Sequence, residues 1–495
     1  MAFNQTLKVT QSSRIALKEL FAADTKSASG QNPFYKGSDN TMGPEAAAGS
    51  DSPYVMINGA IVEDISYLEI NETDILPKIK IIFKDVTGSL SGPNYPKNEP
   101  ILSLYIRVSN EKLKPIRMDF LITNIKSDQD AILDAENMGS SAEFTMIGEL
   151  FIPKIYDYRS KAYRGVGSKE ALMQLADDLD LGFSENDSAT NDVMTWINPN
   201  RNGIYFIDHI SRHAYLNEDT FFDCFIDKFF NLTFVNVPIQ LVDNPELDVT
   251  LEQRPDSSEL EISREFKTKN SDKDTNESLA ILQLTNSPRF RGKTEYIHAH
   301  SLLGEVGSIL KNKGYRKKIY YYDHVLDSDK FTQFYVKPIG VKELSEGTQL
   351  IPANESLRGT MIHKWMNIDY GNTHREWNAA SLINDHNKSE LKKVKLKVET
   401  AGVNLQVVRG SSIKVNMFSD ARSARDRAAA VTDRPKNFTG DSATIDPAQF
   451  VPDGLLTGRY YVAGIRYIYD PMEEFKFKTE FDLCRMNWLS ENIID

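Results

Sequence analysis

Two-residue alternation of apolar and polar side chains recurs near both ends of the chain, and this pattern limits the possible folds more than any other. Apart from Thr479, apolar residues stand at every second position of residues 78–84, 393–399 and 475–483, and the positions between them are charged except for Ile82. A run with one apolar face indicates a half-buried antiparallel strand. The sequence therefore predicts antiparallel sheet in the first and the last third of the chain.

The middle of the chain changes to the helical period. Ser168 can cap a helix whose leucines recur at helical spacing up to Leu179, and residues 206–214 predict a second helix. The segment between them, which contains Trp196, is predicted to be a loop. Aromatic and β-branched runs then predict strands, so this region is expected to be a small α/β unit.

Two further helices are predicted in the second half of the chain. One begins after Ser301 and stops at Gly314, with lysines in its last turn that suit the helix dipole. The other opens with a capping box of Thr373 and Glu376 and continues through Leu391. Helices beside antiparallel sheet place the chain in the α+β class.

The first and last β regions share an order of strands that suggests an internal repeat. Three pairs of stretches match in sequence order: 106–108 with 413–415, 120–125 with 460–465, and 144–150 with 477–483. Period-two strings also align by chance, so two unrelated antiparallel sheets remain the alternative. If the duplication is real, three copies of the chain can build a ring of six units, which converts threefold into pseudo-sixfold symmetry.

Charge, length and cysteine content exclude several classes of protein. A chain of 495 residues is too long for one core and should form about three or four domains. A net charge of −12 without a long basic run argues against sequence-specific nucleic-acid binding. An acidic surface would suit the wall of a conduit that DNA crosses, although it also simply favours solubility.

Targeting signals and disulfides are not expected either. The two cysteines, Cys224 and Cys484, cannot form a disulfide framework and are predicted to fill the core. No apolar run approaches the roughly 18–20 residues of a membrane helix, so no membrane insertion is predicted. The first residues lack an apolar signal core, which predicts a protein that stays in the cytoplasm where it is synthesised.

Three stretches carry motifs in a distinctive order. The first runs from Tyr54-Val-Met-Ile-Asn-Gly through Leu76-Pro77 to Phe83-Lys-Asp85, and the second from Ser168 through Trp196 to Ile210. The third contains Lys364-Trp365, Asp369-Tyr370, His374, Trp377, Asn384, Gly402 and Arg409-Gly410. This order resembles the hub proteins of phage contractile tails and the related spike-hub proteins of type VI secretion.

The resemblance implies two antiparallel tail-tube-like β-barrel domains with small inserted α/β domains. The expected divisions are a partly disordered N-terminal arm over 1–52, barrel 1 over 53–158 with completion from 230–242, a helix-containing α/β insert over 159–242, a linker over 243–278, a mixed α/β lobe over 279–345, and barrel 2 over 346–495 with a long loop over 419–453. The arm, the linker and the long loop have no counterpart in the family, so their contacts cannot be transferred.

The resemblance also implies a role and partners. The chain would be a structural, non-enzymatic baseplate hub in the virion tail, forming a homotrimeric ring around the channel for DNA and tape measure. It would join the tail tube to the central spike and contact tube, tape-measure and wedge proteins. The residues that carry the family-like motif are Trp196, Trp365, His374, Trp377 and Asn384.

Motifs for chemistry are scarce. Nucleophile-elbow, phosphate-loop, zincin and Cys-x-x-Cys patterns are missing from the sequence, and no cofactor, catalytic or metal site is predicted. His209 and His213 lie four residues apart on the predicted second helix, but no third ligand is evident, so a solvated pair is the expected reading. His298 and His300 are read in the same way.

Several other features leave two interpretations open. The tryptophans 196, 365, 377 and 488 fit core or subunit contacts better than platforms for sugars or bases. Arg422, Arg425 and Arg427 lie in a long loop that is either solvated or ordered against an acidic neighbouring subunit. The rival functions are a tail-tip peptidoglycan hydrolase, whose carboxylates would carry no signature, and a host-surface carbohydrate-binding module.

Overall fold

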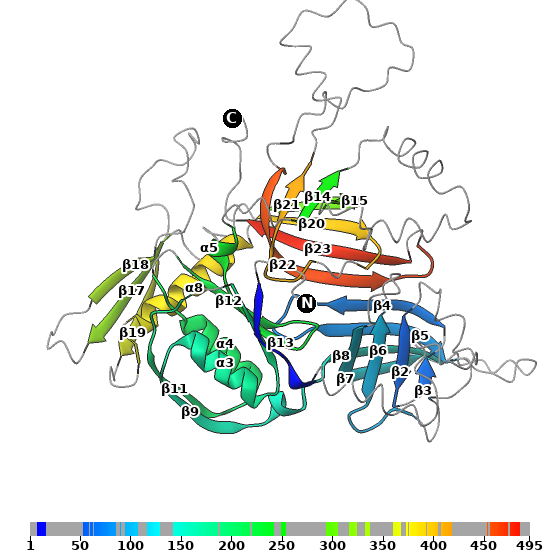
Figure 1. Cartoon of the computed structure of the whole chain (residues 1–495), viewed down its shortest axis with the longest axis horizontal. Coiled ribbons are helices and arrows are strands. Elements are labelled where there is room, and N and C mark those ends of the chain that lie inside the picture. Colours follow the sequence, from blue (N-terminus) through cyan, green and yellow to red (C-terminus); the bar gives the residue numbers. More distant parts are fainter. Residues whose placement is uncertain are drawn as a thin grey trace, which may run out of the picture.

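The fold is given by a computed structural model, which describes part of the chain. The described residues are 7–15, 53–58, 60–62, 64–85, 90, 95–106, 116–128, 142–186, 189–217, 220–241, 249–253, 294–304, 316–323, 332–336, 360–367, 373–374, 376–392, 394–403, 407–417, 453, 456–473 and 476–485. They form mainly β-sheet with few helices (Figure 1), as the α+β class predicts. None of the described helices is long and apolar enough to span a membrane.

The first set of strands follows the predicted alternation. It comprises β2 (Tyr54–Ile57), β3 (Ala60–Val62), β4 (Ile65–Asn71), β5 (Lys78–Asp85), β6 (Ile101–Ile106), β7 (Ile116–Asp128) and β8 (Ala142–Leu150). Their order in space is β4-β5-β8-β7-β6-β2-β3, and every pair is antiparallel. Every second residue of β8 is buried, and Ile79, Ile81 and Phe83 of β5 lie in the core.

The second set of strands comes from the second half of the chain. It comprises β14 (Val249–Gln253), β15 (Thr294–Ile297), β16 (Ala299–Gly304), β20 (Val394–Ala401), β21 (Ser412–Asn416), β22 (Gly458–Tyr469) and β23 (Phe477–Arg485). Their pairing gives the order β16-β20-β23-β22-β21-β14-β15. β14 is parallel to β15 and β21, whereas the other pairs are antiparallel.

The two sets have the same order. When the strands of each set are numbered along the chain, both read 3-4-7-6-5-1-2. Both also carry a bulge at the same place, at Thr123 in β7 and at Ala463 in β22. These two residues are equivalent in the sequence match of 120–125 with 460–465, so the position of the bulge agrees with that match.

The other two sequence matches are displaced in register. Pairing from the bulges makes Gly148 equivalent to Leu483, which is two residues from the sequence alignment. Leu102 becomes equivalent to Ile413, which is four residues from it. Both displacements are an even number of residues. A shift of two or four residues keeps every side chain on its face of the sheet, so the apolar pattern is unchanged and cannot reveal the error.

The two sets are joined edge to edge within the chain. The C-terminal part of β22 pairs antiparallel with β4, with Tyr467 opposite Ile70. This pairing merges both sets into one 14-stranded sheet, and Figure 1 shows β4 and β22 lying side by side. The contact joins strand 3 of the first set to strand 6 of the second set.

The inserted unit has its own sheet. Its order is β1-β10-β13-β12, formed by β1 (Lys8–Gln11), β10 (Gly182–Glu185), β13 (Asn231–Asn236) and β12 (Phe222–Ile226). The predicted helices are present as α3 (Ser168–Asp178) and α4 (Gly203–His213), and α5 (Val237–Gln240) adds a short turn of helix. Residues 231–236 therefore belong to this sheet, and the expectation that 230–242 completes the first barrel is wrong.

The loop predicted around Trp196 is also wrong. Residues 194–201 form strand β11 (Met194–Arg201), which pairs with β9 (Arg159–Val166). The pairing partner lies 30 residues earlier in the chain, so short-range periodicity gave no sign of it. The strand places Trp196 in the core with its side chain fully buried.

The remaining elements form a third region. Helix α8 (Trp377–Leu391) agrees with the helix predicted from the capping box, and a three-stranded sheet has the order β18-β17-β19, from β18 (Thr332–Val336), β17 (Arg316–Asp323) and β19 (Thr360–Asn367). Two predictions need correction. The helix expected after Ser301 is wrong for residues 302–304, which continue β16 because they pair with β20. Residues 249–253, expected to be linker, form β14.

Candidate functional site

Metal-ligating and thiol groups are the first candidates for chemistry in the described part of the chain. No group of three His, Cys, Asp or Glu side chains in that part of the chain could hold a metal ion. Cys224 and Cys484 are both buried, and burial raises the pKa of the Cys484 thiol to about 12. The thiols therefore fill the core, as expected from their apolar neighbours.

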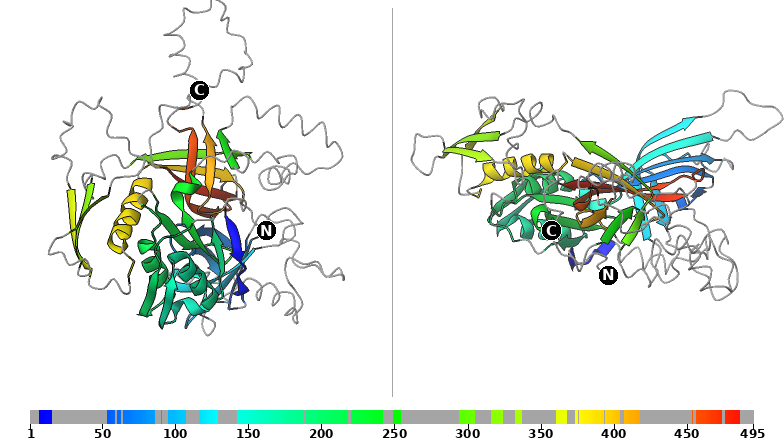
Figure 2. Two further views of the ribbon diagram at one scale, coloured as in Figure 1. Left: turned by 60° about the vertical axis from the view of Figure 1, so that its left-hand side comes forward. Right: turned by 90° about the horizontal axis from the view of Figure 1, so that it is seen from above.

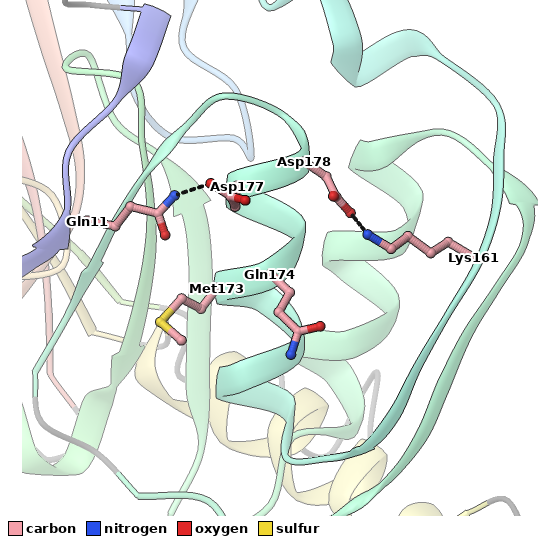
Figure 3. A pocket seen from close by; sticks show the side chains of 6 residues that line it. All are labelled: Gln11, Lys161, Met173, Gln174, Asp177 and Asp178. Atoms are coloured by element: carbon pink, nitrogen blue, oxygen red, sulfur yellow. Dashed lines mark hydrogen bonds and ion pairs between the residues drawn. The ribbon is translucent and has the colours of Figure 1, made fainter.

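A hollow beside α3 is lined by two carboxylates that point toward different neighbours, Asp177 toward Gln11 and Asp178 toward Lys161 (Figure 3). It is lined by Gln11, Lys161, Met173, Gln174, Asp177 and Asp178. Asp177 forms an ion pair with Arg14 at 2.6 Å. Asp178 forms an ion pair with Lys161 and accepts a hydrogen bond from the Tyr163 hydroxyl at 2.8 Å. Each carboxylate thus ties a neighbouring strand or segment to the helix, which is a structural role rather than an acid–base pair.

Four of the five residues of the family-like motif meet at one place. The rings of Trp196 and Trp377 are 5.7 Å apart, and the His374 ring lies 6.2 Å from Trp196. The Asn384 side chain accepts a hydrogen bond from the backbone N–H of Phe222 at 2.8 Å and donates to the carbonyl oxygen of Ala214 at 2.8 Å, next to the His213 carbonyl oxygen that bonds to His374. We call these four residues the tryptophan junction. It fixes α8 to the inserted unit.

The other residues singled out in the sequence lie elsewhere. Trp365 is on β19, and its side chain lies outside the described residues, as do Trp488 and the arginines Arg422, Arg425 and Arg427. His209 and His213 do share one face of α4, as their spacing predicted, but the expectation of a solvated pair is wrong because His213 is buried. His213 stacks on Trp377 with ring centroids 3.6 Å apart, so it belongs to the wall of the tryptophan junction.

These histidines make the junction sensitive to acid. Burial lowers the pKa of His209, His213 and His374 below the ordinary value of a histidine, and that of His213 well below it. The unfolded chain therefore binds more protons than the folded chain below about pH 6.5, so stability falls as the pH drops through that value.

A His213→Phe variant should lose part of this dependence. Phenylalanine keeps the stacking on Trp377 but cannot be protonated. Between pH 7.5 and 5.5 the wild type should lose about 1 kcal/mol more unfolding free energy than the variant. Urea unfolding at both pH values, followed by tryptophan fluorescence, measures the difference. Equal losses in the two proteins would contradict the assignment to His213.

A buried ionic junction connects the inserted unit to both sets of strands. Lys228, at the β12–β13 turn, lies 3.4 Å from a carboxylate oxygen of Glu72 and donates a hydrogen bond to the Tyr467 hydroxyl at 2.6 Å. The side chains of Lys228 and Glu72 are 0% and 1% exposed. Burial alone would lower the pKa of Lys228, but Glu72 and Tyr467 raise it above its ordinary value. The lysine therefore stays charged in the core.

A second buried cation lies close to the same place. The Arg409 guanidinium stacks 4.1 Å from the Phe225 ring, donates to the carbonyl oxygen of Asp74 and lies 3.7 Å from Asp223. Although burial alone would raise the pKa of Asp223, Arg409 holds it below its ordinary value. Gly410 has φ +84°, and a Cβ there would meet Phe225 at 2.9 Å, so this close approach requires glycine.

Sequence reasoning missed the ionic junction. Its signal was present in the run from Phe221 to Phe230, where Asp223, Asp227 and Lys228 interrupt an otherwise apolar and aromatic stretch. Charged residues inside such a run are buried with it, and a buried charge needs a partner. The partner, Glu72, lies more than 150 residues away and could not be chosen from the sequence.

No protein-family model matches the chain, and no curated protein matches it. Among solved structures it is similar to a tail protein from Neisseria meningitidis MC58, with 10% identity, 88% of this chain and 97% of that chain covered, and a TM-score of 0.44. It is also similar to the 43 kDa tail protein of prophage MuSo2 from Shewanella oneidensis, with 7% identity, 88% and 99% covered, and a TM-score of 0.47.

A third similar structure is the E. coli c3393 protein, which is described as a component of the type VI secretion system with structural similarity to the T4 bacteriophage tail proteins gp27 and gp5. The identity is 8%, the coverage is 87% of this chain and 76% of that chain, and the TM-score is 0.39.

Proposed function

We propose that the chain is a structural hub of a phage contractile tail, which forms a homotrimeric, pseudo-sixfold ring between the tail tube and the central spike. The observation that carries the proposal is the strand order 3-4-7-6-5-1-2, which occurs twice in one chain. Two units with this strand order, which differ in the direction of strand 1, allow three chains to present six similar lobes to a sixfold tube and to keep threefold symmetry toward the spike. The tail context rests on the three sequence stretches that resemble the hub family.

Each set of strands is proposed to close into a barrel. In the first set β3 and β4 stand at opposite ends of the path but are separated by only two residues in the chain. In the second set β15 and β16 stand at opposite ends and are separated only by His298. Because the two end strands of each set are consecutive in the chain, each sheet has to curve until its two edges come close together. This curvature favours a barrel for each set, closed where the two end strands meet.

The ring would surround a channel for DNA and the tape-measure protein. The net charge of −12 disfavours binding of a polyanion to its wall. Contacts with spike, tube and wedge proteins, including one through Arg422, Arg425 and Arg427, remain predictions from the sequence, as do the domain divisions and the tail-baseplate location.

The rival functions have less support. Trp196 is fully buried and Trp377 packs against His213, so neither is free to serve as a carbohydrate platform. The carboxylates of the hollow beside α3 are held in ion pairs, which does not suit the two working carboxylates of a peptidoglycan hydrolase. The chain is therefore proposed to act mechanically and without a cofactor.

The oligomeric mass of the purified full chain tests the proposal. Light scattering after size exclusion should give three times the 56.1 kDa chain mass, at micromolar concentration and moderate salt. A zymogram of the same fraction should show no clearing of cell wall. A monomer at all concentrations, with or without a spike partner, would contradict the ring, and clearing would favour the hydrolase.

A further inference from the structure

We infer that neighbouring chains join by antiparallel pairing of β16 of one chain with the end of β7 of the next, in the register that β4 and β22 use within a chain. This inference rests on the proposed function and specifies the surface that would close the ring. The two sets of strands contact each other once within a chain, and we expect the equivalent contact to form again between neighbouring chains.

The equivalent edges follow from the repeat. β4 is strand 3 of the first set and β22 is strand 6 of the second, and these two pair. Strand 3 of the second set is β16, and strand 6 of the first set is β7. If the arrangement of the first and second sets within a chain is repeated between chains, the second set of one chain contacts the first set of the next. This contact brings β16 against β7.

Both edges are open in the described part of the chain. Strand β22 pairs with β21 over residues 458–461 and with β4 over residues 466–469. On β7, β6 pairs only as far as Leu121, and no described strand continues beyond it. β16 pairs with β20 alone, whereas its equivalent β4 has β5 on one side and β22 on the other.

The surfaces of these edges fit a partner strand. Leu303 on β16 is 55% exposed and is therefore available for contact with a neighbouring strand. The end of β7 is exposed from Lys126 to Asp128, and in the right-hand view of Figure 2 the β7–β8 hairpin (cyan) projects beyond the neighbouring strands. The unpaired backbone N–H and C=O groups of an open edge are a template for another strand, and the charged Lys126 and Asp128 on β7 limit pairing with unspecific partners.

The register can be stated residue by residue. The bulges make Ile125 equivalent to Ile465, so Lys126 corresponds to Arg466 and Ser127 to Tyr467. Pairing through β20 makes Leu302 equivalent to Ile70 and Leu303 to Asn71. Because Arg466 lies opposite Asn71 in the contact within the chain, Lys126 should lie opposite Leu303 of the next chain.

A disulfide between these two positions tests the register. Opposite residues in an antiparallel pair have Cα atoms about 4.5–5.5 Å apart, which a disulfide can bridge. The full chain with Lys126→Cys and Leu303→Cys should give covalent oligomers on a non-reducing gel after mild oxidation. The native cysteines are buried and are the same in every variant.

The matched control moves one cysteine by two residues on the same face. Lys126→Cys with Ser301→Cys places the thiols on a diagonal of about 7–8 Å, so on the order of tenfold less linked chain is expected. A trimeric mass with equal or no linkage for both pairs would overturn the register while the proposed function stands. A monomeric mass, or a disulfide within one chain, would overturn the pairing between chains, and the monomeric mass would also contradict the ring.

Discussion

Replacing Lys228 with methionine is expected to lower the unfolding free energy by about 3–5 kcal/mol. The substitution keeps most of the side-chain volume but leaves the carboxylate of Glu72 buried without its cation, in a place where both side chains are almost completely shielded from water. It also removes the hydrogen bond to Tyr467. The lysine connects the inserted unit to both sets of strands. The inserted unit should therefore separate from these strands at a lower urea concentration than in the wild type.

Two comparisons make this result specific. The double variant Lys228→Met with Glu72→Leu removes both charges and should be more stable than Lys228→Met alone, since a buried ion pair can often be replaced by apolar groups. Lys78→Met breaks an exposed pair with Asp74 and should cost no more than about 0.5 kcal/mol. If the double variant is as unstable as the single one, the cost does not come from the stranded carboxylate.

Trp196→Ala should cost a similar amount, about 3–5 kcal/mol. The indole is fully buried, its N–H donates to the carbonyl oxygen of Val166 at 3.1 Å, and its ring lies against Trp377. Removing it leaves a cavity between β11 and α8, so α8 should lose protection before the strands do. Hydrogen exchange of the α8 peptides, with urea unfolding of the whole chain, measures both effects.

The neighbouring residue provides the control. Ile197 follows Trp196 on the same strand but points outward and is 49% exposed. Ile197→Ala should therefore change the unfolding free energy by no more than about 0.5 kcal/mol. A large loss for Ile197→Ala, or unchanged exchange of α8 in Trp196→Ala, would show that the tryptophan junction does not hold the helix.

The parts of this fold that the sequence predicted are those encoded within a single strand or helix. Alternation located the strands at both ends, and the match of 120–125 with 460–465 even contained the bulge at Thr123 and Ala463. Caps and apolar spacing located α3, α4 and α8. Each of these signals lies in a short window, where the burial of one face is visible directly.

Features that depend on distant partners could not be predicted. β14 contains one described buried residue, Leu251, inside a polar stretch, and becomes a strand because β15 and β21 pair with it. Leu302 fits a strand and a helix equally well, and only β20 decides between them. The tryptophan junction was found through a family-like order of residues, whereas its geometry depends on β11 and α8 meeting in space.

Cryo-electron microscopy of the purified oligomer would show the arrangement of the chains in the ring. We expect three chains with six lobes of similar outline, in which the two sets of strands alternate and β16 of one chain lies beside β7 of the next. A ring in which like units face each other, or an assembly whose two sets of strands cannot be superposed, would contradict this arrangement.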